Sequence, residues 1–198
     1  MKITKLNTPL SEVDIRKLRI GDTVYLNGIV YITRDLGHKR IVDYIQQGKE
    51  LPVSLEGAAI YHAGPVVNKK NDEWDIVNCG PTSSARMNPY SPAIIKVGVR
   101  ALIGKGSMDD ATLKAMKTHG AVFLAAYSLA NIQVQHFEQV LGVHWLDLST
   151  TEAIWVVRVK DWGPLIAAMD SHGNNLYSEI AQRARERLTE LPTSLSPQ

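Results

Sequence analysis

The sequence predicts a mixed α/β fold, with hairpin β structure in the first half and βαβ units in the second. Two observations indicate this class. Runs rich in β-branched and aromatic residues, separated by short polar turns, fill the first half, whereas strand-like and helix-like segments alternate from residue 92 onward. No linker-like segment divides the 198 residues. We therefore expect a single domain over residues 1–190, followed by a disordered tail over residues 191–198.

The composition is that of a soluble globular protein. Hydrophobic residues make up 44% of the chain, charged residues 21%, and the net charge is only +2. So small a net charge gives no support for a nucleic-acid or membrane partner, and no apolar run approaches the ~20 residues that span a bilayer. The single cysteine excludes an internal disulfide and suits a reducing cytoplasm. It also excludes a cysteine-ligated metal cluster held by this chain alone.

The first two elements have clear local signals. Residues 11–18 begin with Ser11, and Asp14 follows three residues later in a capping-box pattern, which predicts a short helix. Residues 23–32 contain two β-rich runs on either side of Asn27-Gly28. This pair favours positive φ at both central positions of a type I′ turn, so the segment is predicted to be a β-hairpin.

The next elements follow from spacing and turn residues. Residues 36–47 carry apolar side chains at helical intervals, and Asp35 is the predicted N-cap of that helix. Residues 57–63 and 74–79 are predicted to be strands, joined across the polar turn 68–73.

The second half is predicted as an alternation of helices and strands that ends in an amphipathic helix. The predicted elements are helix 92–98, strand 100–104, helix 109–120, strand 121–126, helix 128–139, strand 143–148, strands 152–162 and 164–170, and helix 175–188. Such alternation is typical of a parallel sheet.

Three polar motifs stand at the ends of predicted elements, where a scaffold aims side chains into a cleft. The first is RDLGH, which contains Arg34, Asp35 and His38. On this motif alone, a capped helix with a surface arginine is the favoured interpretation. The second is GPTSSAR, at residues 80–86, in which backbone N–H groups and Arg86 could bind a carboxylate or phosphate. A turn rich in serine and threonine that caps the next helix is the alternative.

The third motif is LIGKGSM, in which Lys105 lies between two glycines after a strand. Lys105 is either a solvated loop residue or a cation delivered to a cleft. Together the motifs supply three cations at strand ends, Arg34, Arg86 and Lys105, with Thr82 among them. That set suits a small molecule with two carboxylates, and the residues alone take the inference no further.

Several segments together resemble one known family. They are GDTVYLNGIVYITRDLGHKR, YHAGPV, GPTSSARM, IGKGSM and PLIAAMDSHGN, in that order. The same order occurs in the β subunit of two-subunit class I fumarases, the β subunit of L-tartrate dehydratase, and the C-terminal domain of single-chain class I fumarases. The resemblance runs from about residue 10 to residue 190.

The resemblance implies a swivelling β/β/α domain and a hydro-lyase that reversibly hydrates fumarate to malate. In that family a [4Fe–4S] cluster is held by three cysteines of a larger α subunit, so the partner here would be a cysteine-bearing α subunit, in an α2β2 heterotetramer in the cytoplasm. Residue by residue, the resemblance implies catalytic roles for Thr82 and Lys105 and substrate-binding roles for Arg34, Asp35, His38 and Arg86.

This sequence departs from the family pattern in three places. Ser107 stands where relatives commonly have glycine, the segment 125–131 reads AAYSLAN in place of a glycine pair, and residues 149–152 read STTE in place of Gly-Met-Pro-Glu. Side chains at lost glycines would crowd a ligand that approaches the backbone closely. L-Tartrate therefore stays open as the substrate, and so does a catalytically silent paralogue that acts as a binding or regulatory module.

Overall fold

The computed structural model describes residues 2–127 and 130–189 and confirms the mixed α/β class. The strands are β1 Ile3–Asn7, β2 Thr23–Thr33, β3 Ala59–His62, β4 Val66–Lys70, β5 Glu73–Asn78, β6 Ala101–Gly104, β7 Val122–Ala125, β8 Phe137–His144 and β9 Ile154–Met169. The α-helices are α1 Glu12–Ile15, α2 Asp35–Gln46, α3 Ser91–Lys96, α4 Asp110–His119, α5 Ala130–Gln133 and α6 Leu176–Thr189. Three 3₁₀ turns are η1 Ser84–Met87, η2 Val134–His136 and η3 Leu146–Leu148.

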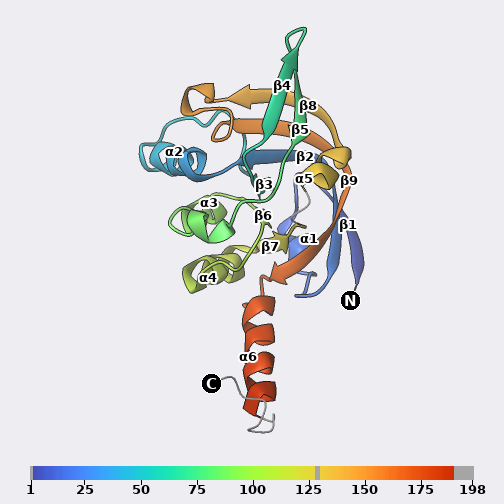
Figure 1. The fold of residues 1–198 in the computed structure, drawn as a ribbon. Helices are drawn as coiled ribbons and strands as arrows, with labels where there is room; N and C mark the ends of the chain where they lie inside the picture. The colour runs from blue at the N-terminus through green and yellow to red at the C-terminus, as the bar shows by residue number, and fades with distance from the viewer. Residues whose placement is uncertain (1, 128–129, 190–198) are drawn as a thin grey trace, which may run out of the picture.

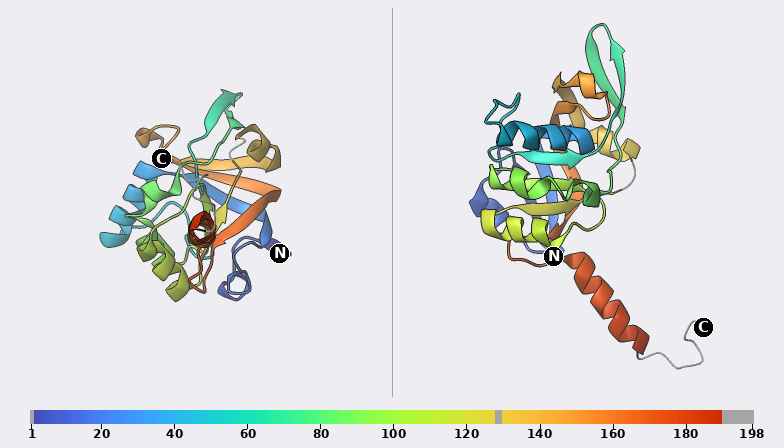
Figure 2. Two further views of the ribbon diagram at one scale, coloured as in Figure 1. Left: turned by 60° about the horizontal axis from the view of Figure 1, so that its bottom comes forward. Right: turned by 90° about the vertical axis from the view of Figure 1, so that its left-hand side faces the viewer.

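The main sheet has the order β1-β2-β3-β6-β7-β9-β8, and a further pairing of β2 with β9 closes its central strands into a ring (Figure 1). Neighbours from β1 to β7 run parallel, whereas β9 is antiparallel to β2, β7 and β8. Helices α2, α3 and α4 lie side by side over one face, and α6 projects from the body of the domain (Figures 1 and 2). Among the described residues, no helix has the length and apolar character needed to cross a membrane.

Two apolar clusters hold these layers together. On β3, Ile60 belongs to the cluster beneath α2, α3 and α4, while the adjacent Tyr61 belongs to the cluster inside the ring. This division follows from the alternation of side chains along a strand. β3 and β6 are buried along their whole length, as parallel strands covered on both faces are. The rigid parallel strands therefore end at a well-defined edge.

Several local predictions are confirmed. Ser11 caps α1 by accepting a hydrogen bond from the backbone N–H of Asp14 at 3.1 Å. Helix α4 ends at Gly120, which has a left-handed conformation with φ +68°. In these places the residues that signal an element also make the contacts that begin or end it.

The predicted hairpin at Asn27-Gly28 is wrong. β2 runs straight through both residues, with β1 on one edge and β9 on the other, and the β2–β9 register shifts between Leu26 and Gly28. Gly28 keeps a positive φ of +97°, and a Cβ there would lie 2.5 Å from Oγ1 of Thr8. The pair therefore forms a bulge where the chain packs closely, and strand pairing on both edges overrides its preference for a turn.

Residues 57–63 and 74–79 each contain a predicted strand, but the prediction that a turn at 68–73 joins them directly is wrong. β3 lies in the main sheet, while β5 pairs with β4, a strand that was missed because its second half lies in the polar segment 68–73. The actual turn is at Asn71 and Asp72, with φ of +50° and +62°. The resulting hairpin extends beyond the sheet (Figure 1).

Three boundaries need correction after residue 127. Within the predicted helix 128–139, residues 128–129 lie outside the described residues, 130–136 are helical, and the strand β8 already begins at Phe137. The strand predicted over residues 143–148 ends at His144, and a 3₁₀ turn follows. The two strands predicted on either side of Gly163 are one 16-residue strand, β9, which long pairings with β2, β7 and β8 keep continuous. The predicted disordered tail also lies outside the described residues.

Candidate functional site

The predicted residues gather where three neighbouring parallel strands end. Arg34 follows β2, and Lys105 follows β6, with β3 between these strands. The segment that contains Thr82 crosses the same edge, since the Thr82 N–H donates to the carbonyl of His62 at 2.7 Å and Ser83 bridges to Lys105. Ligands commonly bind at the carboxyl ends of such strands.

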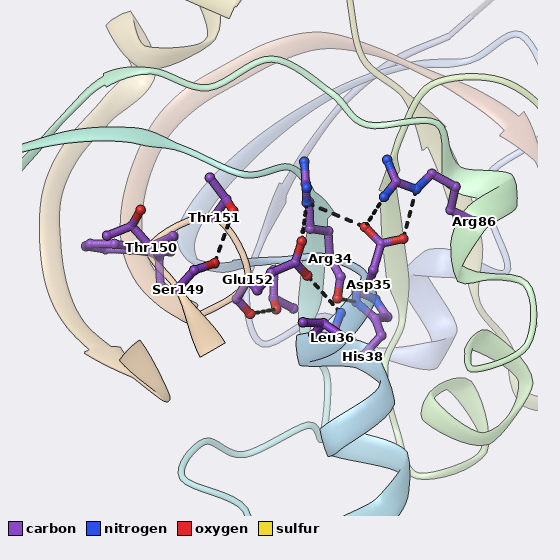
Figure 3. Close-up of polar contacts among 11 residues, drawn as sticks. Arg34, Asp35, Leu36, His38, Arg86, Ser149, Thr150, Thr151 and Glu152 are labelled. Atoms are coloured by element: carbon purple, nitrogen blue, oxygen red, sulfur yellow. Dashed lines mark hydrogen bonds and ion pairs between the residues drawn. The ribbon is translucent and has the colours of Figure 1, made fainter. Parts of the chain in front are cut away.

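Arg34 is held by a residue that the sequence analysis assigned no role, Glu152. The Nε–H of Arg34 donates to Oε1 of Glu152 at 2.6 Å (Figure 3). The other carboxylate oxygen, Oε2, accepts from the backbone N–H of Leu36 at 2.7 Å. Helix α2 begins at Asp35 with Arg34 in the N-cap position, so the prediction of Asp35 as the N-cap is wrong. Glu152 supplies an acceptor at this helix start from a distant segment.

Arg86 is held in turn by Asp35. Its Nε–H and Nη2–H donate to the two carboxylate oxygens of Asp35 at 2.9 and 2.7 Å, and Nε of Arg34 lies 3.5 Å from the same carboxylate (Figure 3). Arg86 is about half exposed, whereas Asp35 is largely covered. The two arginines are thus joined through Asp35 into one charged group, and Arg86 is the more exposed of the two.

Two buried histidines contact residues near the ends of these strands. Nδ1 of His38 donates to the carbonyl of Arg34 at 3.0 Å, and Nδ1 of His62 lies 2.9 Å from Oγ of Ser84. Their rings meet edge to face at 4.9 Å, and neither Nε2 has a hydrogen-bond partner among the described residues. Burial lowers the pKa of His38 to about 4, and burial lowers the pKa of His62 as well. Both rings are therefore neutral near pH 7.

This burial predicts a loss of stability in mild acid. Because the pKa of His38 is lowered from 6.5 to about 4, the unfolded chain binds a proton that the folded chain does not between these values. The contribution of neutral His38 to stability is then fully present above pH 6.5 and is lost as the pH falls toward 4. This loss lowers the free energy of unfolding by about 3 kcal/mol from His38 alone. Urea unfolding at a series of pH values measures this, and a free energy of unfolding that stays constant from pH 7 to pH 4 would contradict it.

Close packing at the edge depends on two glycines. A Cβ on Gly104 would lie 2.1 Å from Oγ of Ser84, and a Cβ on Gly64 would lie 2.9 Å from Cβ of Thr151 and 3.3 Å from Nη1 of Arg34. The absence of a side chain at Gly64 therefore lets the segment 149–152 lie against Arg34.

The three departures from the family pattern have distinct surroundings. Oγ of Ser107 accepts from Nδ2 of Asn175 at 3.0 Å, which ties the loop after β6 to the loop before α6. Tyr127 is 53% exposed, while residues 128–129 lie outside the described residues. Ser149 has φ +127° and ψ 165°, a backbone conformation suited to glycine. Of the three, Ser149 is the departure with evident backbone strain.

Replacing Ser149 with glycine should therefore stabilise the protein. Relief of the strain outweighs the added flexibility of a glycine in the unfolded chain, for a net gain of about 1 kcal/mol. Ser149→Ala is the matched control, because it removes the same hydroxyl and keeps the Cβ. The melting temperature should rise for the glycine variant and not for the alanine variant. Equal shifts for the two would show that the backbone at residue 149 stores no strain.

The described residues do not offer a metal site. No group of three or more His, Cys, Asp or Glu side chains within them is arranged to hold a metal ion. The single cysteine, Cys79, is buried at the end of β5, and burial raises the pKa of its thiol well above the ordinary value. Cys79 thus has the environment of a structural thiol. A cluster that needs three thiolates does not fit this chain.

A hollow lies beside the β4–β5 hairpin. A space of about 840 Å³ opens between the β4–β5 hairpin and β8, lined by Trp74, Phe137 and their neighbours. None of the six predicted site residues lines it, nor does Glu152. This hollow is therefore not formed by the predicted site residues.

Comparison with known proteins agrees with the family that the sequence resembles. Residues 1–180 match the family model described as Fumarase C-terminus. A Methanocaldococcus jannaschii protein with the provisional name L(+)-tartrate dehydratase subunit beta is 43% identical, with 92% of this chain and 95% of that protein covered. The L(+)-tartrate dehydratase subunit beta of Escherichia coli K12 is 39% identical, with coverage of 92% and 90%.

A longer relative shows the same segment as part of a larger chain. A Geobacillus stearothermophilus protein with the provisional name fumarate hydratase class I is 41% identical over 96% of this chain, which corresponds to 36% of that protein. The names of these relatives denote hydro-lyases, and two of them denote a β subunit. This chain belongs to the fumarase C-terminus family.

Proposed function

We propose that this chain is the β subunit of a hydro-lyase that reversibly hydrates fumarate to malate. In this proposal it supplies substrate-binding and proton-transfer residues to a pocket shared with an α subunit. The observation that carries the proposal is the gathering of Arg34, Thr82, Arg86 and Lys105 at the ends of β2, β3 and β6. Arg34 pairs with Glu152 and Arg86 pairs with Asp35, and Lys105 adds a third cation, so the group carries a net positive charge that would attract an anionic substrate.

In the proposed pocket, the two arginines bind the substrate carboxylates. A guanidinium has two edges that can each meet a carboxylate with two hydrogen bonds. For Arg86, the edge made by Nε and Nη2 is taken by Asp35, while Nη1 makes no hydrogen bond among the described residues. Arg34 likewise uses Nε toward Glu152. The terminal edges of both side chains then remain to meet a ligand.

Thr82 is the proposed proton-transfer residue, and Lys105 is proposed to act beside it. A free threonine hydroxyl is too weak a base to take a proton from carbon near pH 7. It serves only where neighbouring cations lower its pKa or where it passes the proton to a carboxylate on another chain. Lys105 is exposed and is linked to Thr82 through a backbone contact of 3.4 Å, so its ammonium would stabilise negative charge that develops on the substrate.

The family resemblance implies that Asp35 and His38 bind substrate, whereas we propose an indirect role for both. The carboxylate of Asp35 is occupied by Arg86, and a free carboxylate would repel a dianionic substrate. His38 is fully buried and hydrogen-bonds the backbone of Arg34. We therefore propose that these two residues fix the arginines in place.

A partner chain is part of this proposal. A [4Fe–4S] cluster with one open iron needs three thiolates, and this sequence has one cysteine. The cluster would be carried by a cysteine-bearing α subunit, with which we propose an α2β2 heterotetramer in the reducing cytoplasm. The cluster would bind the substrate hydroxyl that this reaction adds or removes, and the present chain would close over it.

L-Tartrate is the second candidate substrate, favoured by the names of the relatives from M. jannaschii and E. coli. Both substrates present two carboxylates, so the arginines alone do not distinguish them. The test is to co-express this chain with its α subunit, prepare the complex without oxygen, and assay it with fumarate and with L-tartrate. Turnover of fumarate at the higher kcat/KM supports the proposal, a preference for tartrate supports the second candidate, and no turnover of either supports the silent paralogue.

A further inference from the structure

We propose that Glu152 is a positioning residue, which aims Arg34 at the substrate carboxylate and couples the segment 149–152 to the binding site. This inference rests on the proposed function, since it concerns how the same arginine meets a dicarboxylate. Glu152 is 7% exposed, although an acidic side chain is rarely so buried unless it is paired. Its surroundings explain why it is buried.

Both carboxylate oxygens of Glu152 are used, and each holds a different part of the site. Oε1 accepts from Nε of Arg34 at 2.6 Å, and Oε2 accepts from the N–H of Leu36 at 2.7 Å. The second contact pins the start of helix α2, on which Arg34 occupies the N-cap position. Arg34 is therefore fixed twice by one side chain, through its guanidinium and through the backbone beside it (Figure 3).

The backbone around Glu152 is itself held against the site. The carbonyl of Glu152 accepts from Oγ1 of Thr33 at 3.1 Å, in the last residue of β2. Thr151 lies against Gly64, whose missing side chain leaves room beside Nη1 of Arg34. The segment is therefore held at Thr33, which precedes Arg34, and lies against Gly64, so a small shift of Glu152 would move the guanidinium.

Glutamine at residue 152 tests the carboxylate without removing volume. A carboxylate accepts hydrogen bonds at both oxygens, whereas a glutamine side chain has one acceptor and one donor group. The glutamine oxygen in Glu152→Gln can therefore accept a hydrogen bond from either Arg34 or the Leu36 N–H. The remaining N–H then faces the NH₂ group of the glutamine, which is also a donor. A loosened Arg34 should raise the KM for substrate by about 10-fold, with a smaller change in kcat, because the lost contact serves binding.

The chain offers a matched control. Arg40 and Asp147 form a second ion pair, at 2.8 Å, between helix α2 and the segment just before Ser149. Asp147 is exposed and its partner is not one of the site residues, so Asp147→Asn removes a link between the same two parts of the fold without touching Arg34. Asp147→Asn should leave both kinetic parameters near the wild-type values.

The experiment uses the anaerobically prepared complex with its α subunit and combines kinetics with titration calorimetry of succinate, a dicarboxylate that cannot be hydrated. Weaker succinate binding and a raised KM for Glu152→Gln, with Asp147→Asn unchanged, support the positioning role. Wild-type KM and succinate affinity for Glu152→Gln overturn it, and so do equal losses in both variants. If Glu152→Gln does not assemble, Glu152→Asp replaces it, since the shorter carboxylate cannot reach both donors, and wild-type affinity there overturns the proposal equally. A wild-type complex that binds succinate but hydrates neither substrate overturns the proposed function alone.

Discussion

Replacing Thr82 with valine is expected to lower the turnover of the assembled enzyme by at least ~100-fold. Valine keeps the shape of threonine and removes the hydroxyl, so a proton-transfer step loses its donor and acceptor while the pocket is preserved. The backbone contacts of Thr82, from its N–H to His62 and from its carbonyl to Lys105, do not depend on the side chain. Substrate binding should therefore change much less than kcat, and steady-state kinetics on the anaerobic complex measures both.

Thr82→Ser is the control, because it restores a hydroxyl at the same backbone position. Serine should recover most of the lost rate if proton transfer is the role of this residue. A loss for Thr82→Val of less than about threefold would remove Thr82 from the mechanism, since general acid–base groups contribute at least ~100-fold.

Replacing Arg86 with lysine is expected to reduce kcat/KM by about 10- to 100-fold although the charge is kept. Arg86 holds Asp35 with two nitrogens, and in the proposed site its remaining edge binds the substrate. A lysine has one ammonium and cannot do both at once. The loss of the Arg86–Asp35 pair should also loosen Arg34, whose Nε lies 3.5 Å from the same carboxylate.

Arg40→Lys is the matched control for this prediction. Arg40 also pairs with Asp147 through two nitrogens, Nη1 and Nη2, at 3.0 and 2.8 Å, and is not one of the predicted site residues. Its replacement should be close to neutral in turnover. Wild-type kinetics for Arg86→Lys would favour the simpler interpretation of GPTSSAR as a helix-capping turn.

The most reliable predictions from the sequence concern helix ends, which are set by residues close together along the chain. Ser11 caps α1 and Gly120 ends α4, because each makes its contact within a few residues. Asn27-Gly28 has an equally clear local signal and yet forms a bulge, since β1 and β9 pair with the strand on both sides of it. The preference of two residues for a turn is small beside a ladder of hydrogen bonds on both edges.

The candidate site shows the same division. Arg34, Thr82, Arg86 and Lys105 stand in motifs, so sequence indicated each of them before their common edge was known. Glu152 lies 118 residues from Arg34 along the chain and has no local motif of its own. Only the pairing in space shows that its carboxylate holds Arg34 and the N–H of Leu36.

The most direct test of this account compares the chain alone with the chain mixed with its α subunit under anaerobic conditions. One cysteine cannot supply the three thiolates of a hydro-lyase cluster, so the isolated chain should carry no iron–sulfur chromophore and hydrate nothing. Co-purification with a cysteine-bearing partner, and brown colour and hydratase activity that appear only in the mixture, are the predicted results. Hydration of fumarate by the isolated, metal-free chain would contradict the account.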